Sequence, residues 1–304
     1  MIQSIRNIFE HNTRLLGEMD KAIYYFRGQQ IDMALGHMAK SIDEVRISIE
    51  TIISNRDYFN VVDTESMLEM LKGILEAKKN KDFILLADLL ELQLINFLIG
   101  VQELIISKEE IDFNEDSYRD NIEVLLNHSE GLEDSLREPI DTAKLLESGY
   151  RVEFTSCGLM TLAAENDGCQ FYFHTNSKIQ TEAFLLAKQW FQRERKHYHI
   201  YGFGMGYHIR ELLALDPLAQ ITVYEADADV IKLACAFTDM KNVFHSHKVK
   251  VIFDPKFARM DEMLSNPEKE GDLLVHYPSY KNIKENKGRE LLASGLPWLE
   301  TIEA

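Results

Sequence analysis

From about Tyr150 onward, short apolar and β-branched runs alternate with helical patterns, and this alternation constrains the fold more than any other feature of the sequence. Strands are predicted at residues 199–201, 221–225, 249–253 and 272–276, with a helical pattern between neighbouring strands. Strands that alternate with helices form a mostly parallel sheet, because each helix carries the chain back to the same edge. The sequence therefore predicts an α/β Rossmann-like C-terminal domain over residues 149–304.

Three further short strands are predicted before this series, at residues 151–155, 158–163 and 170–174. Asn166, Asp167 and Gly168 stand between the last two strands, and residues of these types tolerate the left-handed backbone of a tight hairpin turn. We therefore expect a β-hairpin element at the start of the C-terminal domain, followed by a helix over about residues 178–194.

The first 148 residues instead repeat apolar side chains at three- and four-residue spacing, as in Ile31, Leu35 and Met38. Asp63 and Asp82 each precede an apolar run and are predicted N-caps, because their carboxylates accept hydrogen bonds from the first free backbone N–H groups of a helix. The connections are short. The sequence therefore predicts five or six helices in an antiparallel all-α helical bundle domain over residues 1–148.

Residues 83–101 are the most apolar stretch of the chain, but Asp88 and Glu91 interrupt them. Two acidic groups are costly in a membrane, so a buried helix is predicted here instead of a span. The three cysteines have no paired spacing, and the first residues lack the apolar core of a signal peptide. We therefore expect a cytoplasmic protein with no membrane insertion.

The formal net charge of −17 lies mostly in the first 148 residues. An excess of carboxylates repels phosphate backbones, so nucleic acid is not an expected partner. The helical domain is expected to supply a lid, a surface for a protein acceptor or a contact between two copies of the chain.

Gly202, Gly204 and Gly206 lie between the first strand of the α/β series and a helix that begins at about Tyr207. Ligands of open α/β sheets bind at this edge, where glycine lets backbone N–H groups approach a phosphate. Glu225 ends the next strand, where a carboxylate can accept hydrogen bonds from ribose hydroxyls. We therefore predict that the loop binds a nucleotide or a nucleoside-bearing cofactor. The structural alternative is that the glycines only permit tight packing.

The spacing GxGxG is nearer to that of S-adenosylmethionine-dependent methyltransferases than to the GxGxxG of NAD enzymes. Those methyltransferases usually carry an acidic residue just before the first glycine, where this chain has Tyr201. Their sheets also have more strands than the series predicted here. S-adenosylmethionine is therefore an alternative cofactor.

A wider set of residues occurs in a fixed order: 172–177 (YFHTNS), 182–183 (EA), 200–208 (IYGFGMGYH) and 223–227 (VYEAD). This combination resembles the motility accessory factor family, which shares a domain with hydroxymethylpterin pyrophosphokinases. The resemblance covers roughly residues 150–280.

The resemblance implies a transferase that uses a nucleotide-activated donor. Motility accessory factors are linked to the transfer of nonulosonic sugars from CMP donors to flagellin, whereas the pyrophosphokinase branch transfers pyrophosphate from ATP to a pterin alcohol. The resemblance places Gly202, Gly204, Gly206 and Glu225 at the nucleotide, with His174, Glu182 and His208 nearby as catalytic candidates.

Further cofactor-binding candidates stand at strand ends or at the start of the following helix: Tyr207, Asp227, Asp254, His276 and Tyr277. All of them belong to the edge where the cofactor is expected. Structural roles are the alternatives for His208 and Glu182, in the first turns of helices, and for Asp254, in a turn.

No metal site is predicted. His197 with His199, and His245 with His247, lack cysteine or carboxylate partners at ligand spacing. A divalent ion such as Mg²⁺ is expected only together with the phosphates of a nucleotide.

Three functions therefore stay open. The first is a nucleotide-dependent transferase that takes a sugar from a nucleotide-activated donor in protein glycosylation. The second is an S-adenosylmethionine-dependent methyltransferase, and the third is a non-catalytic Rossmann-like ligand-binding or scaffold protein. The nucleoside that binds separates the first two, and binding without turnover marks the third.

Overall fold

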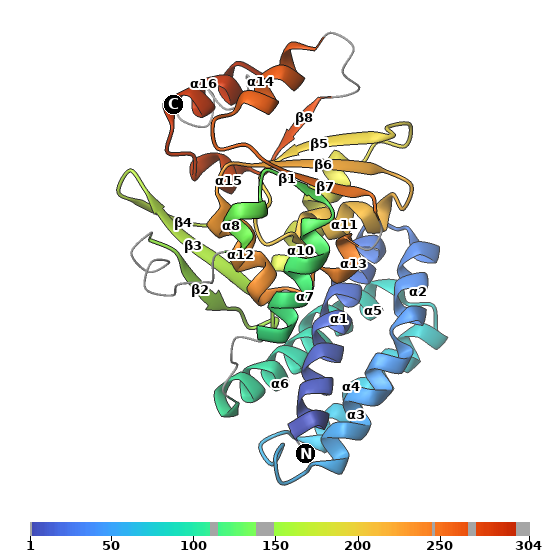
Figure 1. Ribbon diagram of the computed structural model, residues 1–304. Helices are drawn as coiled ribbons and strands as arrows, with labels where there is room; N and C mark the ends of the chain where they lie inside the picture. Colours follow the sequence, from blue (N-terminus) through green and yellow to red (C-terminus); the bar gives the residue numbers. More distant parts are fainter. Residues whose placement is uncertain (1, 110–114, 138–148, 245–246, 267–271, 296–304) are drawn as a thin grey trace. The chain divides into compact units, whose positions relative to one another are not determined.

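The computed structural model describes residues 2–109, 115–137, 149–244, 247–266 and 272–295 (Figure 1). Contacts divide the chain into two compact units. The helical unit comprises residues 1–111, 154–159 and 177–181, and the α/β unit comprises the remaining residues. The predicted fold class is confirmed, because helices come first and a parallel sheet with helical crossovers follows.

The helical unit contains the helices α1 (Ile2–Arg27), α2 (Ile31–Lys40), α3 (Ile42–Ser54), α4 (Thr64–Lys79), α5 (Phe83–Leu89) and α6 (Ile95–Lys108), with the π-helical turn η1 (Leu90–Leu94) between the last two. Helix α1 contacts α2, α3, α5 and α6. Both predicted N-caps are confirmed: the Asp63 carboxylate accepts hydrogen bonds from the first turn of α4, and Asp82 accepts one from Leu85 N.

The core of the helical unit includes the buried amide of Gln102. Gln102, on α6, donates from Nε2 to the Phe9 carbonyl at 3.0 Å and to Thr13 Oγ1 at 2.9 Å. The later segment 177–181 of this unit also bonds to α1, since Gln180 Nε2 donates to the Thr13 carbonyl at 2.6 Å and Thr181 Oγ1 donates to Asp20 at 2.6 Å. Polar contacts therefore fix α1 to α6 and to residues 177–181.

Helices α5, η1 and α6 run together as Phe83–Lys108, the one described helix that is long and apolar enough to cross a membrane. Leu86, Leu90 and Leu94 belong to its buried face, and α1 contacts the same helix. Ile84 and Leu92 lie outside that face and are exposed. Burial of one face is typical of a core helix in a soluble protein, so the predicted buried helix is buried along one side.

The α/β unit contains a five-stranded parallel sheet in the order β1-β7-β6-β5-β8 (Figure 1). Its strands are β1 (Ser129–Glu130), β5 (His197–Tyr201), β6 (Gln220–Glu225), β7 (Val249–Phe253) and β8 (Leu273–Val275). Strands β6 and β7 follow β5 on one side, whereas β8 returns to the other side of β5. The topological switch point of the sheet therefore lies between β5 and β8.

The described helices of this unit are α7 (Glu115–Leu126), α8 (Glu133–Arg137), α10 (Ile179–Trp190), α11 (Tyr207–Leu215), α12 (Ala228–Phe237), α13 (Lys241–Phe244), α14 (Ala258–Ser265), α15 (Tyr277–Lys281) and α16 (Asn286–Gly295). The first three residues of α10 belong to the helical unit. Tyr201, Tyr224 and Ile252 of the sheet share one apolar cluster with residues of α14, α15 and α16. These three helices therefore cover one face of the sheet.

The predicted hairpin is confirmed. Strands β2 (Arg151–Phe154), β3 (Met160–Asn166) and β4 (Cys169–Tyr172) form a separate sheet in the order β2-β3-β4. Strands β3 and β4 are antiparallel, with Asn166 opposite Cys169. Asp167 and Gly168 between them both have positive φ, 52° and 74°, as a tight hairpin turn requires.

The predicted domain boundary at residue 148 is wrong, because α7 and β1 belong to the α/β unit. Strand β1 is the edge strand beside β7. The buried Asn121 of α7 donates from Nδ2 to the carbonyls of Cys235 and Thr238, both at 2.8 Å, and accepts from Met240 N at 3.2 Å. Helical periodicity identifies α7 as a helix but does not tell which core the helix joins.

Replacing Asn121 with alanine is expected to lower the free energy of unfolding by about 2–3 kcal/mol, because buried backbone groups lose their hydrogen-bond partner. Urea unfolding followed by circular dichroism measures the change. Asn127→Ala is the matched control, since the exposed Asn127 side chain, just after the end of α7, donates to the nearby Glu123 carbonyl of the same helix. Equal losses in the two variants would show that Asn121 does not hold α7 to α12.

Candidate functional site

Residues 202–206 join β5 to α11 at the switch point. Gly206 is the N-cap of α11 and has a left-handed backbone with φ 77°. Its carbonyl accepts the first hydrogen bond of the helix, from Arg210 N at 3.1 Å. The predicted strand–loop–helix arrangement is therefore confirmed.

The loop is buried along its whole length, and every residue from 201 to 209 is in the buried class. Side chains from elsewhere in the α/β unit pack against it. A Cβ atom at Gly202 would stand 2.5 Å from Ser279 Oγ, and one at Gly206 would stand 2.5 Å from Met240 Cε. In this conformation the lack of a Cβ at these glycines lets neighbouring side chains pack directly against the loop. Tight packing is the role that competes with ligand binding for these glycines.

Glu225 bonds to the backbone of the same loop. Its side chain is buried, Oε2 accepts from Phe203 N at 2.9 Å, and Oε1 accepts from Ala226 N at 2.8 Å and Asp227 N at 3.0 Å. Burial raises the pKa of Glu225 to about 7, and the charge of Asp227 acts in the same direction, against the three N–H donors. Both oxygens that were expected to meet a ribose are thus engaged with the protein.

Asp227 is also engaged. Its Oδ1 accepts from Asp229 N at 2.9 Å as the N-cap of α12, and its Oδ2 accepts from the Tyr150 hydroxyl at 2.5 Å. The same hydroxyl accepts from Asn282 Nδ2 at 2.6 Å. Tyr150 and Asn282 therefore occupy the space beside this predicted cofactor-binding carboxylate.

His174 and Glu182, two of the catalytic candidates, lie together in the structure. His174 follows β4, and its carbonyl accepts from Thr161 Oγ1 at 2.6 Å. Its Nδ1 lies 3.1 Å from Glu182 Oε1, while Glu182 Oε2 accepts from Thr175 N at 2.6 Å. The His174 side chain is fully buried and that of Glu182 is 33% exposed. Glu182 is therefore the member of this pair that solvent reaches.

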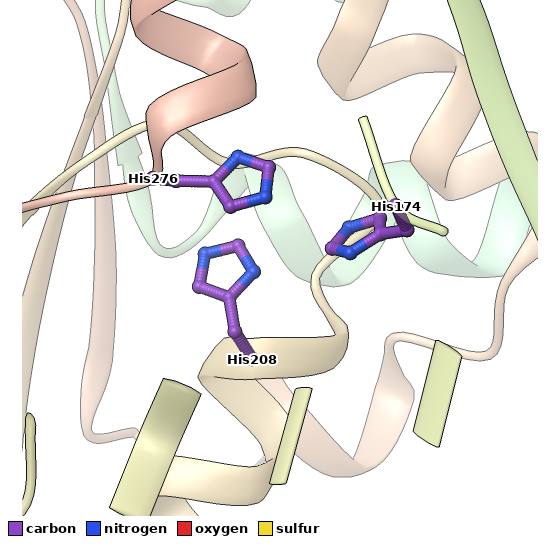
Figure 2. A group of neighbouring side chains, drawn as sticks. All are labelled: His174, His208 and His276. Atoms are coloured by element: carbon purple, nitrogen blue, oxygen red, sulfur yellow. The ribbon is translucent and has the colours of Figure 1, made fainter. Parts of the chain in front are cut away.

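His208 and His276 complete a cluster with His174, and all three are buried (Figure 2). One ligand nitrogen from each ring lies within 4.8 Å of the others. The rings of His208 and His276 are nearly parallel, 7° apart, with centroids 4.5 Å apart, and the His174 centroid lies 5.0 Å from that of His276. Three segments meet here: His174 is the second residue after β4, His208 lies in the first turn of α11, and His276 directly follows β8.

Each of the two stacked rings has one nitrogen with a partner and one without. His208 Nε2 lies 3.2 Å from the Gly202 carbonyl, and His276 Nδ1 lies 2.8 Å from Ser279 Oγ. His208 Nδ1 and His276 Nε2 are buried and make no hydrogen bond within the described residues. An unpaired buried polar atom costs about 1–3 kcal/mol, so this arrangement is incomplete as a purely structural network.

Both of these imidazoles are neutral at pH 7. Burial lowers the pKa of His208 to about 3, with His174 acting in the same direction and the Gly202 backbone opposing. Burial also places the pKa of His276 well below its usual value, helped by His208 and His174 and opposed by the backbone of Phe173. Neutral imidazole is the form that binds metal ions.

The remaining candidates lie outside the histidine cluster or beside it. The Tyr207 hydroxyl donates to the Met160 carbonyl at 2.8 Å, and its ring centroid lies 5.1 Å from that of His174. Asp254 accepts from Ala258 N and Met260 N, both at 2.9 Å, and so caps α14. Tyr277 opens α15, where its ring stacks on Tyr280.

No metal site was predicted at these three histidines, although each of them was a candidate residue. Ligand spacing is visible only among histidines that are neighbours in the sequence, whereas His174, His208 and His276 come from three distant segments. Their positions could have indicated the cluster, because each of the three histidines stands at a strand end or a helix start on the same edge of the α/β unit.

Comparison of the chain with protein-family models, with curated proteins and with solved structures finds no match.

Proposed function

We propose that this protein is a transferase that uses a nucleotide-activated donor, and that the donor binds at the carboxyl edge of the parallel sheet. The observation that carries the proposal is the position of residues 202–206, at the switch point between β5 and β8 and ahead of the N-terminus of α11. Open α/β sheets bind their ligands at this place. The N-terminus of α11 offers partial positive charge to a donor phosphate, which a Mg²⁺ ion would accompany.

Glu182 is the group that we assign to proton transfer. It is partly exposed, it borders the buried cluster, and His174 fixes the position of its carboxylate. As an acceptor hydroxyl forms a bond to the donor carbon, Glu182 takes the hydroxyl proton, and the nucleotide leaves with the electron pair of the broken bond. A positioned general base contributes typically about 10²–10⁴-fold to rate.

Donor binding requires the loop to open. The loop is buried under Met240, Ser279 and His276, and Glu225 is bonded to its backbone. The bound state therefore differs from the described one by movement of these side chains, and part of the binding free energy is spent on that movement.

The helical unit is our candidate for acceptor binding or for contact with a second copy of the chain. Large apolar side chains on its helices face solvent, among them Leu75 at 66%, Ile84 at 74% and Leu92 at 65% exposure. Where such side chains form one contiguous apolar patch, a protein partner is the usual cover. A protein acceptor in the cytoplasm is consistent with the net charge, which disfavours nucleic acid.

A non-catalytic ligand-binding or scaffold protein is the second candidate. The observation that favours it is the complete burial of residues 201–209 together with the engagement of both Glu225 oxygens. If the loop never opens, the motif maintains the fold and holds no donor.

Titration calorimetry and thermal shift with CMP, CDP, GDP, ATP, NAD and S-adenosylhomocysteine, with and without Mg²⁺, separate these functions. We expect a nucleotide to bind and to raise the melting temperature, because a ligand at a hundred times its Kd adds about 2.7 kcal/mol of stability. Binding of S-adenosylhomocysteine alone would instead indicate methyl transfer. Absence of binding across the panel would contradict the transferase and support the non-catalytic role.

Where a nucleotide binds, Glu182→Gln tests the chemistry. Nucleotide release from the matching activated sugar is expected to slow by about 10²–10⁴-fold while affinity is kept. Glu165→Gln, at an exposed position on β3, is the matched control and leaves the rate unchanged. An unchanged rate in Glu182→Gln would remove Glu182 from the reaction.

A further inference from the structure

We propose that His174, His208 and His276 bind a divalent transition-metal ion of the zinc type through three imidazole nitrogens. The ligand atoms are His174 Nε2, His208 Nδ1 and His276 Nε2. The other nitrogen of each ring already has a polar partner in the protein. This inference does not depend on the proposed transferase function.

The second ring nitrogen of each histidine has a polar partner. Metal-bound histidines almost always pair this nitrogen with a carboxylate, a backbone carbonyl or water, which fixes the tautomer and orients the ring. His174 Nδ1 pairs with the Glu182 carboxylate, His208 Nε2 with the Gly202 carbonyl and His276 Nδ1 with Ser279 Oγ. All three rings therefore have the second contact that a metal site requires.

Two buried ring nitrogens have no hydrogen-bond partner among the described residues, His208 Nδ1 and His276 Nε2. They belong to the set that would coordinate the ion, and both atoms are buried. A bound cation would satisfy both lone pairs at once. Glu182 would supply one compensating negative charge through His174.

The geometry is close to that of a bound state. All three nitrogens lie within 4.8 Å of one another, and in a triangle whose sides are all at this upper limit the centre lies about 2.8 Å from each nitrogen, against the 2.0–2.1 Å of a zinc–imidazole bond. Each nitrogen would have to move inward by about 0.7 Å, and the nearly parallel rings of His208 and His276 would have to tilt. Side-chain rotations of this size do not require a new backbone.

One contact must be exchanged. Met205 N lies 3.2 Å from His174 Nε2, to which it donates, so coordination of that nitrogen replaces this hydrogen bond. Gly204 leaves room for the change, since a Cβ at this position would stand 3.0 Å from His174 Nε2 and 3.0 Å from His276 Cε1. The fourth coordination position would take water or hydroxide, as in other sites with three histidine ligands.

Imidazole ligands suit Zn²⁺, Cu²⁺, Ni²⁺ and Fe²⁺ and are poor ligands for Mg²⁺ and Ca²⁺. The probe of choice is Co²⁺, which takes the zinc geometry and absorbs visible light. After metal removal with a chelator and dialysis, we expect one equivalent of Co²⁺ to bind with the visible bands of a four-coordinate nitrogen and oxygen site. Zn²⁺ is expected to displace the cobalt. Zn²⁺ added to the metal-free protein is expected to raise the melting temperature.

The variants His208→Gln and His276→Gln keep side-chain volume and remove one ligand each. Both are expected to lose the cobalt spectrum and the zinc-induced shift in melting temperature. Glu182→Gln is expected to weaken zinc binding by about 10–100-fold, the usual effect of removing the partner of a metal-bound histidine. The zinc-induced shift is measured against the metal-free form of the same variant, so a variant with lower stability still gives an answer.

The exposed pair His128 and His247, whose ring nitrogens lie 3.2 Å apart, provides the matched control. His128→Gln with His247→Gln is expected to keep the single equivalent, the spectrum and the shift. The proposal is overturned if the unchanged protein binds no stoichiometric metal after dialysis. It is also overturned if His208→Gln and His276→Gln both still bind the metal, or if the double variant of His128 and His247 no longer binds it.

Discussion

Alanine in place of Gly202 is expected to lower the free energy of unfolding by about 4 kcal/mol. Gly202 has φ 102°, where a residue with a Cβ is strained by about 1–3 kcal/mol. The added Cβ would also stand 2.5 Å from Ser279 Oγ and 2.9 Å from His276 Cβ, and overpacking of this kind costs about 1–3 kcal/mol more. A loss of that size is a large part of the stability of an ordinary domain, so the variant is expected to unfold at much lower urea concentration.

Gly168→Ala separates the two causes. Gly168, in the β3–β4 turn, also has positive φ, 74°, but a Cβ there would meet nothing within 4 Å. This variant is expected to show the backbone strain alone, about 1–2 kcal/mol. The difference between the two alanine variants then measures how tightly α15 packs on the loop. Equal losses would mean that Ser279 and His276 move aside easily, which would favour donor access to the loop.

The stability of the protein is expected to fall by about 3 kcal/mol as the pH rises from about 4.5 to about 7, through Glu225 alone. The folded-state pKa of Glu225 is about 7 and its usual value is 4.5. The folded state therefore holds this proton more tightly, and stability that is complete below pH 4.5 is lost by pH 7, at about 1.36 kcal/mol for each unit of pKa shift.

Glu225→Gln isolates this contribution, because every other group titrates alike in both proteins. The stability of the variant relative to the unchanged protein is expected to increase by about 3 kcal/mol between pH 4.5 and pH 7. Urea unfolding at several pH values measures it. Glu262→Gln, at a side chain that is 75% exposed, serves as the control and should leave the pH profile unchanged. A parallel profile for Glu225→Gln would show that Glu225 is already ionised in the folded state.

Local features of the fold were predictable from the sequence because their causes are local. Asp63 and Asp82 cap helices with their own side chains, and Asp167 with Gly168 turns a hairpin, so neighbouring residues determine each of them. The position of the glycine loop between β5 and α11 follows from the same kind of pattern. Helix α7 was assigned to the wrong unit, because its place depends on the contacts of Asn121 with distant residues of the α/β unit.

The candidate site was predictable only in part. That His174 and Glu182 meet could be expected from one strand end and the helix that follows it. The place of His276 beside His208 depends on β8 pairing with β5 on the side opposite β6, and strand order is a tertiary property. The burial of the loop likewise results from Met240 and Ser279, which no pattern around the glycines reveals.

The chain passes between its two units at five points, since residues 154–159 and 177–181 return to the helical unit. This interleaving has a consequence for synthesis on the ribosome, where the N-terminal part emerges first. Helix α1 is complete long before Gln180 and Thr181 exist, yet the Thr13 carbonyl and the Asp20 carboxylate take these residues as partners. The nascent helical bundle therefore cannot reach its final set of contacts until much of the following unit has been translated. The two units are expected to mature together rather than in sequence.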